Sequence, residues 1–219
     1  MSNPMRELIL KMSISIDGFV ADANSGLSWI FGHDAEATAW TLEVVWDAGL
    51  HIMGSRTFRD MAHFWPTSTE VFAAPMNQIP KAVFSRQGKS VLDAAGATLG
   101  MRDALASAGA TQSAQRQPGA ESWAQAYVAT GSLTEEIGRL KAQQGKPIIA
   151  HGGAAFARSL IAAGLVDQYD LLVHPVALGK GLPVFSDLAA PKRLKLVSST
   201  AFPKGSVAQI YRQAATTKP

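Results

Sequence analysis

Hydrophobic and polar residues alternate near the start of the chain, over residues 7–16. Every second position is apolar, which is the repeat of a β-strand with one buried face: Leu8, Leu10, Met12, Ile14 and Ile16. Asp17 and Gly18 follow, and this pair is typical of a tight turn. The pattern therefore predicts a first strand that ends in a turn at residue 17.

A helical repeat follows between Asp34 and Gly49. Apolar residues recur there at spacings of three and four, Asp34 is suited to cap the first turn, and Gly49 is suited to end the helix. Short strands are expected over residues 50–53 and 81–85, with a short helix between them.

A strand-helix-strand pattern occupies the second half of the chain. Ser132 and Glu135 have the spacing of a capping box at the start of a helix. Residues 146–151 predict a buried strand, residues 154–163 a helix and residues 168–174 another strand. Strands that alternate with helices of about ten residues predict a mostly parallel sheet flanked by helices.

The last third of the chain differs, because two strand patterns occur there without a helix between them. They cover residues 194–199 and 207–211 and predict an antiparallel C-terminal hairpin at the edge of the sheet. The expected fold class is therefore α/β, in a single domain over residues 1–219. An insertion rich in Ala, Gly, Ser and Gln interrupts it at residues 88–120.

Composition excludes several classes of protein. The chain has no Cys, which excludes disulfide scaffolds, cysteine zinc sites and thiol catalysis. Its net charge is only +3, and no basic stripe indicates nucleic-acid binding. No apolar run approaches the length of about 18 residues that indicates a membrane span, and the first residues lack a signal-peptide pattern. We expect a cytoplasmic protein that binds neither membranes nor nucleic acid and holds no metal.

Three strand ends carry residues suited to bind phosphate: Gly54-Ser55-Arg56-Thr57, Ser85-Arg86 and Gly152-Gly153. Ligands of open α/β sheets bind at the carboxyl ends of strands, where helix N-termini and arginines attract phosphate. Each motif has a simpler explanation by itself, a tight glycine turn or a solvated arginine. Together they indicate a nucleotide with two phosphate regions, although neither a G-x-G-x-x-G nor a P-loop motif is present.

The order of these segments resembles a known family. The segments that match are residues 12–21, 52–58, 83–86, 140–167, 172–176 and 179–185. In these segments the chain is similar to the dihydrofolate reductase-like superfamily, and within it to the reductase domain of the bifunctional riboflavin-biosynthesis deaminase/reductase. The resemblance implies a dihydrofolate reductase-like fold, an NADPH cofactor and a homodimer.

The resemblance also implies roles for individual residues. Gly54, Ser55, Arg56 and Thr57 are expected to line the phosphate side of NADPH, although dihydrofolate reductases usually carry an arginine at the position of Ser55. Ser85 and Arg86 are expected to hold the adenosine 2′-phosphate. The pyrophosphate is expected at Gly152, Gly153, Ala154, Ala155 and Phe156, and the nicotinamide near Ala21.

The substrate side is less clearly marked in the sequence. Folate enzymes place a carboxylate on the helix before the glycine turn, but Ala37, Thr38 and Ala39 occupy the corresponding positions. Asp17 is our candidate catalytic residue, because it ends the first strand beside the expected nicotinamide, and a simple Asp-Gly turn is the alternative. Trp29 and Trp65, both expected on loops, are candidate walls of the site, and His151 adjoins the cofactor loop.

These observations predict a reductase that transfers hydride from NADPH to a C=N or C=O group. The expected substrate is a small heteroaromatic or ribosylaminopyrimidine-like molecule. The alternative is a dimeric nucleotide-binding protein without turnover, which the missing helix carboxylate favours.

Overall fold

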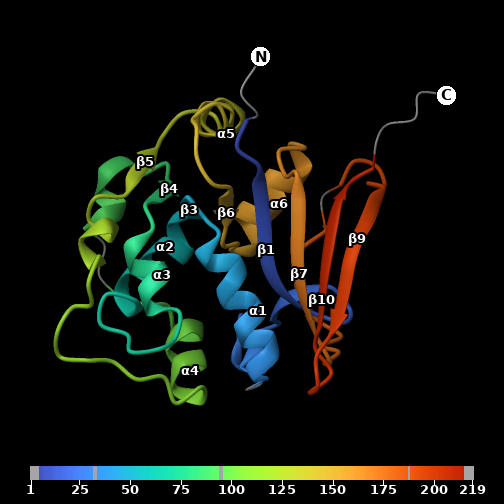
Figure 1. Ribbon diagram of the computed structural model, residues 1–219, viewed down its shortest axis with the longest axis horizontal. Coiled ribbons are helices and arrows are strands. Elements are labelled where there is room, and N and C mark those ends of the chain that lie inside the picture. The colour runs from blue at the N-terminus through green and yellow to red at the C-terminus, as the bar shows by residue number, and fades with distance from the viewer. Residues whose placement is uncertain (1–4, 32–33, 94–95, 187, 215–219) are drawn as a thin grey trace.

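The structure is a computed structural model that describes residues 5–31, 34–93, 96–186 and 188–214 (Figure 1). An eight-stranded sheet crosses it in the order β5-β4-β3-β6-β1-β7-β10-β9. Neighbouring strands from β5 to β7 are parallel, whereas β10 is antiparallel to both β7 and β9. The strands are β1 (Leu8–Ser15), β3 (Leu50–Gly54), β4 (Lys81–Phe84), β5 (Tyr127–Ala129), β6 (Ile148–Ala150), β7 (Gln168–His174), β9 (Leu194–Ala201) and β10 (Val207–Gln213).

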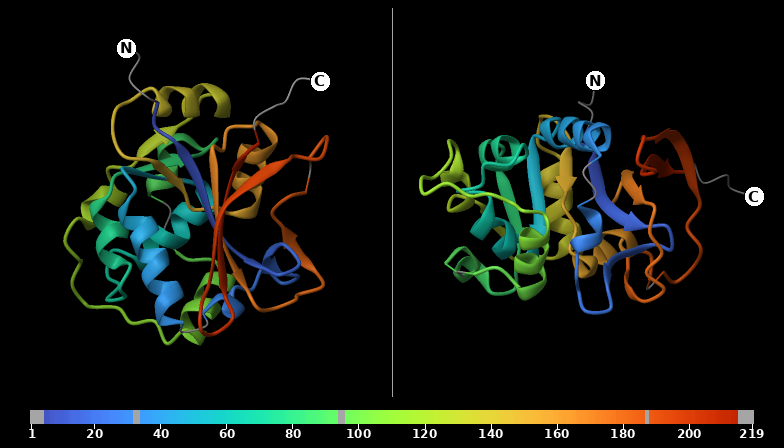
Figure 2. Two further views of the ribbon diagram at one scale, coloured as in Figure 1. Left: turned by 45° about the vertical axis from the view of Figure 1, so that its right-hand side comes forward. Right: turned by 90° about the horizontal axis from the view of Figure 1, so that it is seen from below.

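This architecture confirms the predicted fold class and the antiparallel hairpin at the C-terminal end. Helices lie on both sides of the sheet when the molecule is seen from below (Figure 2). They are α1 (Ala35–Trp46), α2 (Ser55–Phe64), α3 (Ala73–Gln78), α4 (Leu99–Ser107), α5 (Leu133–Lys141) and α6 (Ala154–Ala162). None of the helices in the described ranges is both long enough and apolar enough to span a bilayer.

The predicted alternation in β1 separates two cores. Leu8, Leu10, Met12 and Ile14 pack with α5 and α6 in the largest apolar cluster. Ile9 belongs instead to the cluster on the opposite face, where Ala48 covers the sheet just after α1. Because helices cover both faces, polar residues on the second face of β1 are not directed into bulk water.

A small second sheet follows β1. It pairs β2 (Phe19–Asp22) with β8 (Gly181–Pro183), two segments distant in the sequence. A side chain at Gly181 would overlap the backbone oxygen of Ala21, so only glycine allows this close approach. The sequence patterns did not predict this sheet, because each strand is too short to show a repeat.

The described residues of segment 88–120, which exclude 94–95, contain regular structure and pack on the rest of the chain. They hold the 3₁₀-helix η2 (Gly88–Leu92) and α4, and η3 (Ala120–Trp123) begins at their end. The carboxylate of Asp60 on α2 accepts a hydrogen bond from the Thr98 backbone N–H at 2.6 Å, just before α4 begins. The backbone N–H of Gln117 donates to the Pro66 oxygen at 2.7 Å.

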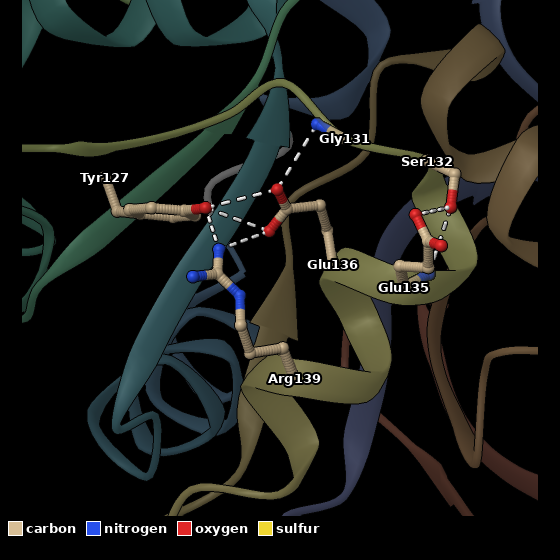
Figure 3. A network of polar contacts seen from close by, with 6 residues as sticks. All are labelled: Tyr127, Gly131, Ser132, Glu135, Glu136 and Arg139. Carbon is tan, nitrogen blue, oxygen red and sulfur yellow. Dashed lines mark hydrogen bonds and ion pairs between the residues drawn. The ribbon is translucent and has the colours of Figure 1, made fainter.

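A polar network joins the edge strand β5 to α5 (Figure 3). The Tyr127 hydroxyl donates to the Glu136 carboxylate, which also accepts from the Arg139 guanidinium and the Gly131 N–H. Ser132 caps the helix as predicted, with its hydroxyl accepting from the Glu135 N–H at 3.3 Å. The Glu135 carboxylate accepts from that hydroxyl. The network is fully explained by its part in docking α5.

Candidate functional site

The predicted phosphate-binding segments come together at one edge of the sheet. They follow β4, β3 and β6, which are adjacent and parallel, so their carboxyl ends share that edge. The rings of Phe84 and Phe156 lie 5.0 Å apart, and a Cβ added to Gly54 would come within 3.1 Å of Phe156. Three segments distant in sequence therefore form one surface.

The two glycines after β6 are required by their backbone conformation. Gly152 and Gly153 have φ angles of 73° and 79°, in the left-handed region that side chains disfavour. A Cβ at Gly152 would also overlap the Met12 sulfur, and one at Gly153 would lie 2.5 Å from the Thr57 hydroxyl. The Thr57 side chain therefore lies directly against the backbone of Gly153. Both residues are predicted to bind cofactor.

The helices that start at this edge have free N-termini. Gly54 precedes α2 and Gly153 precedes α6, and neither start has a side-chain cap. By contrast, Asp34 caps α1 and Ser132 caps α5. Uncapped N–H groups that converge beside glycines suit the oxygens of a pyrophosphate. Ser55 lies in the first turn of α2, and Ala154 and Ala155 lie in that of α6.

The predicted arginines lie at the rim of this surface. Arg56 in α2 and Arg86 after β4 are both exposed, and neither bonds to another residue of the described ranges. Ser85 is buried, and its hydroxyl accepts a hydrogen bond from the Gln87 N–H at 3.1 Å. Both guanidinium groups are thus available to an anion. This end of the sheet therefore offers a dinucleotide free backbone N–H groups, glycines without side chains and positively charged arginines.

Ala21 and Asp17 lie in the segment after β1, which neighbours β6. Ala21 is buried on β2 opposite Leu182. The Asp17 carboxylate is exposed but engaged, since it accepts from the Ser15 hydroxyl at 2.5 Å and the Gly179 N–H at 2.7 Å. These hydrogen bonds, that of Ser15 foremost, lower its pKa. An ionised carboxylate with its oxygens in use is better suited to hold two loops together than to donate a proton.

A second group of polar residues lies on the sheet face beneath α1. Lys11 on β1 and Asp170 on β7 are directly opposite each other in the register. Lys11 is half-buried, and burial lowers its pKa to about 8, while Asp170 acts in the other direction. Burial raises the pKa of Asp170 to about 6, against the hydrogen bond from Gln168. The Lys11 amine bonds to no residue in the described part of the chain.

Two further polar groups on this face have unused hydrogen-bonding atoms. His174 at the end of β7 is 6% exposed, and its ring packs edge-on against Trp29 at 5.6 Å. The His174 Nε2 and Trp29 Nε1 atoms are buried without a partner. Buried polar atoms rarely stay unpaired in proteins, so a ligand or water is expected to complete them. This supports the prediction that Trp29 lines the site.

His151, the residue before Gly152, lies between the phosphate-binding glycines and the polar residues beneath α1. Its Nε2 lies 2.7 Å from Nδ1 of His51, which is fully buried on β3. Burial lowers the pKa of His51 to about 3 and that of His151 well below its usual value. Both imidazoles are therefore neutral at physiological pH.

Lys11, Asp170, His174 and His51 were not identified from the sequence. The alternation in β1 places Lys11 opposite the apolar face, which by itself indicates solvent. The missed signal was the predicted topology: strands of a parallel sheet are covered on both faces, so a charged residue inside one requires an explanation. Lys11 and Asp170 both met that criterion.

Two surface cavities lie beside the sheet, and the larger one is away from this edge. The larger, about 460 Å³, is lined by Leu50, Pro80 and Lys81 among others, where β3 and β4 begin. That is the opposite end of the strands from the glycine loops. The Lys81 amine is already engaged, because it donates to the Asn77 oxygen at 2.9 Å and stacks over Trp123. The second cavity, about 420 Å³, lies along β5.

Known proteins show the same fold. The family model of the RibD C-terminal domain matches residues 6–208. YyaP of Bacillus subtilis (strain 168), an uncharacterised protein, is 27% identical over 213 residues, with 94% of each chain covered. A pyrimidine reductase-like protein of Corynebacterium diphtheriae superposes with a TM-score of 0.60 and 16% identity, covering 96% of this chain and 92% of that one.

Two enzymes superpose as well. The diaminohydroxyphosphoribosylaminopyrimidine deaminase/5-amino-6-(5-phosphoribosylamino)uracil reductase of Thermotoga maritima has a TM-score of 0.57 and 16% identity, over 96% of this chain and 57% of that one. Dihydrofolate reductase of Enterococcus faecalis, solved with NADP(H), has a TM-score of 0.55 and 12% identity, over 95% and 97%. These likenesses confirm the dihydrofolate reductase-like fold.

Proposed function

Because the chain belongs to the RibD C-terminal domain family, we propose that it is an NADPH-dependent reductase of a small heteroaromatic or ribosylaminopyrimidine-like molecule. The observation that carries the proposal is the convergence of the β3, β4 and β6 ends into one surface with two uncapped helix N-termini. Such a surface is suited to the two phosphate regions of a dinucleotide.

Each part of NADPH has a proposed place. Gly54, Ser55 and Thr57 meet the phosphates from α2, while Gly152, Gly153 and the start of α6 meet them from the other side. Ser85 and Arg86 hold the 2′-phosphate, for which a planar guanidinium makes paired hydrogen bonds. Arg56 adds positive charge, and Ala21 contacts the nicotinamide. Phe156 packs against Gly54.

The reaction requires a hydride on carbon and a proton on nitrogen or oxygen of the reduced bond. NADPH supplies the hydride, and the chain holds the two rings at reacting distance. Lys11 is the proposed proton donor, since its half-buried amine has no competing bond among the described residues and its pKa of about 8 leaves it protonated at pH 7. Asp17 holds the loop that borders the nicotinamide.

The test has a binding arm and a turnover arm. Titration with NADPH and NADH, followed by fluorescence, should show preference for NADPH. The variant Arg86→Gln should lose roughly ten- to a hundredfold in NADPH affinity and little in NADH affinity, because it removes a charge-assisted contact to the 2′-phosphate. Equal losses for both cofactors contradict the assignment.

Turnover is followed as the loss of NADPH absorbance at about 340 nm. The substrates to compare are 5-amino-6-(5-phosphoribosylamino)uracil and dihydrofolate, and we expect activity with the pyrimidine. The alternative, nucleotide binding without turnover, is favoured by Ala37, Thr38 and Ala39, which stand on α1 where folate enzymes carry an acid. Tight NADPH binding without oxidation by any candidate substrate supports that alternative.

We also propose a homodimer that forms through β9. Within the described ranges this edge strand pairs with β10 alone, and Leu196 and Val197 on it are 49% and 53% exposed. An open edge with exposed apolar side chains invites pairing with a second strand. Light scattering should give twice the mass of one chain, and Val197→Lys should shift it toward the monomer. A monomeric parent protein contradicts the proposal.

A further inference from the structure

The helix α4 has no part in the proposed hydride transfer, although it lies beside the candidate site. It packs next to η1 (Ser28–Ile30), the short 3₁₀-helix that carries Trp29. In Figure 1 it lies at the lower end of the molecule, toward which β1 runs from the N-terminus. The strands parallel to β1 end on the same side. Hence α4 borders the site on the side of Trp29.

The structure holds α4 in place at both ends. Just before the helix, the N–H and hydroxyl of Thr98 donate to the Asp60 carboxylate at 2.6 and 3.2 Å. Just after it, the Thr111 N–H donates to the Glu70 carboxylate at 2.9 Å, and the Thr111 oxygen accepts from the Thr69 N–H at 3.1 Å. Asp60 lies on α2, and the other two partners lie in the loop that follows α2. The helix is therefore a fixed element that joins α2, where the cofactor is expected, to η1.

The side chains of α4 divide into an inner and an outer group. Met101 and Leu105, one helical turn apart, are half-buried, whereas Arg102 and Asp103 are exposed. Because successive residues of a helix are turned by about 100°, Arg102 stands at the border of the inner side and Asp103 on the outer side. The Arg102 guanidinium makes no hydrogen bond or ion pair with any residue of the described ranges. It is therefore free to bind an anion at that border.

The phosphate of a phosphoribosyl substrate requires a cation that the site has not yet supplied. The two arginines at the glycine loops are assigned to the cofactor. The helix α1, described over its whole length, carries Glu36 and Glu43 but neither lysine nor arginine. Proteins bind phosphate with arginine in particular, because its planar guanidinium makes paired, charge-assisted hydrogen bonds. Arg102 on α4 meets this requirement.

We propose that α4 forms the outer wall of the substrate site and that Arg102 binds the phosphate group of the substrate. The inference rests on the proposed function and adds the residue that recognises the phosphoribosyl end. The cofactor phosphates then lie at the glycine loops, the reacting ring lies near Trp29, and the substrate phosphate lies at α4. Arg102 is a specificity residue in this scheme and takes no part in the transfer of hydride or proton.

The first experiment compares two substrates in the NADPH oxidation assay. They are 5-amino-6-(5-phosphoribosylamino)uracil and the same molecule without its phosphate. Arg102→Gln should raise KM for the phosphorylated substrate roughly ten- to a hundredfold and leave kcat within about twofold, because it removes a charge-assisted contact. KM for the dephosphorylated substrate and the NADPH dissociation constant should not change. Arg102→Lys keeps the charge and should lose less than Arg102→Gln.

Two further variants serve as controls for charge. Lys146→Gln removes a positive charge from a side chain that is 62% exposed and precedes β6, at the opposite end of the strands. It should leave KM for both substrates unchanged. Lys180→Gln tests an exposed cation in the loop that Asp17 binds. If Lys180→Gln raises KM for the phosphorylated substrate and Arg102→Gln does not, the phosphate site is not on α4.

One more kinetic result overturns the proposal. If Arg102→Gln raises KM equally for the phosphorylated and the dephosphorylated substrate, the arginine does not recognise the phosphate.

The second experiment measures binding without turnover. The protein is first saturated with NADPH, so that the cofactor occupies its own phosphate subsites, and is then titrated with ribose 5-phosphate. Nuclear magnetic resonance should show shifts of the Arg102 Nε–H signal and of the Met101 methyl signal, and titration with ribose should show neither. Shifts that are confined to the glycine loops contradict a wall formed by α4.

The outcomes separate this inference from the proposed function. An active reductase whose KM for the phosphorylated substrate does not respond to Arg102→Gln contradicts the role of α4 and leaves the reductase standing. A protein that binds NADPH and ribose 5-phosphate through Arg102, but oxidises NADPH with neither substrate, contradicts the proposed function and supports the phosphate site.

Discussion

The two faces of the central sheet are built from the same strands but differ in chemistry. Toward α5 and α6, β1 and β6 present apolar, buried side chains such as Leu10 and Ile148. Toward α1, β1 and β7 present Lys11 and Asp170, and His151 follows directly after β6. The first face can be explained entirely by packing. The second carries buried ionisable groups whose cost in stability indicates function.

The largest effect on stability is expected on the apolar face. Leu10→Ala deletes a fully buried side chain of β1 and should lower the free energy of unfolding by about 3–4 kcal/mol. Urea unfolding measures this change. Val71→Ala, at a side chain that is 59% exposed, is the control and should cost less than about 0.5 kcal/mol. Similar losses in both would show that Leu10 is less closely packed than the structure has it.

On the polar face, stability should depend on pH through Asp170. Its pKa is raised from 3.8 to about 6 in the folded chain, so the folded state keeps a proton that the unfolded state releases. The free energy of unfolding should therefore fall as the pH rises from about 4 to about 6, by up to about 3 kcal/mol. Asp170→Asn should flatten this part of the curve.

The control for this pH dependence is Asp47→Asn, because the Asp47 side chain is 65% exposed. Urea unfolding of that variant should follow the pH dependence of the parent. A fall that persists in Asp170→Asn would assign the effect to another group.

At the rim between the faces, Gly152→Ala should cost about 1–2 kcal/mol, because alanine disfavours a φ of 73°. It should also weaken NADPH binding, since the new methyl displaces Met12 and narrows the turn. The control is Gly138→Ala in α5, where a Cβ meets nothing within 4 Å. That variant should gain up to about 1 kcal/mol. Thermal unfolding and NADPH titration distinguish the two.

The smallest effect on stability and the greatest on turnover are expected together at Lys11. Lys11→Met keeps the stem and removes a partly desolvated charge, so the free energy of unfolding should change by less than about 1 kcal/mol. NADPH oxidation should nearly cease. Lys146→Met, whose side chain is 62% exposed, should alter neither. An active Lys11→Met variant would show that the polar residues beneath α1 have a structural role and do not take part in the reaction.

The elements could be predicted from the sequence to the extent that each had a local signal. The alternation in β1, the Asp34 cap of α1 and the Ser132 cap of α5 all act within a few residues, and each is found where it was predicted. The β2–β8 sheet had no such signal. It depends on two segments about 160 residues apart, one of which needs glycine at residue 181 for close approach.

The candidate site divides in the same way. The glycine and arginine segments were identified from the sequence because strand ends in a parallel sheet share an edge, whatever their distance along the chain. Their individual contacts with cofactor remain predictions. Asp17 was selected as a catalytic candidate by position alone, and its bonds to Ser15 and Gly179 favour a structural role instead.

The sequence by itself determined the α/β class, the hairpin and the strand ends with phosphate-binding chemistry, because turn residues, caps and side-chain repeats are local properties. Only the tertiary structure decided that Lys11 is half-buried beneath α1, that His51 meets His151, and that Phe84 meets Phe156. Burial and pairing across strands depend on which elements cover a face and on strand order. Neither burial nor pairing across strands can be predicted from the residues that are close in sequence to a given position.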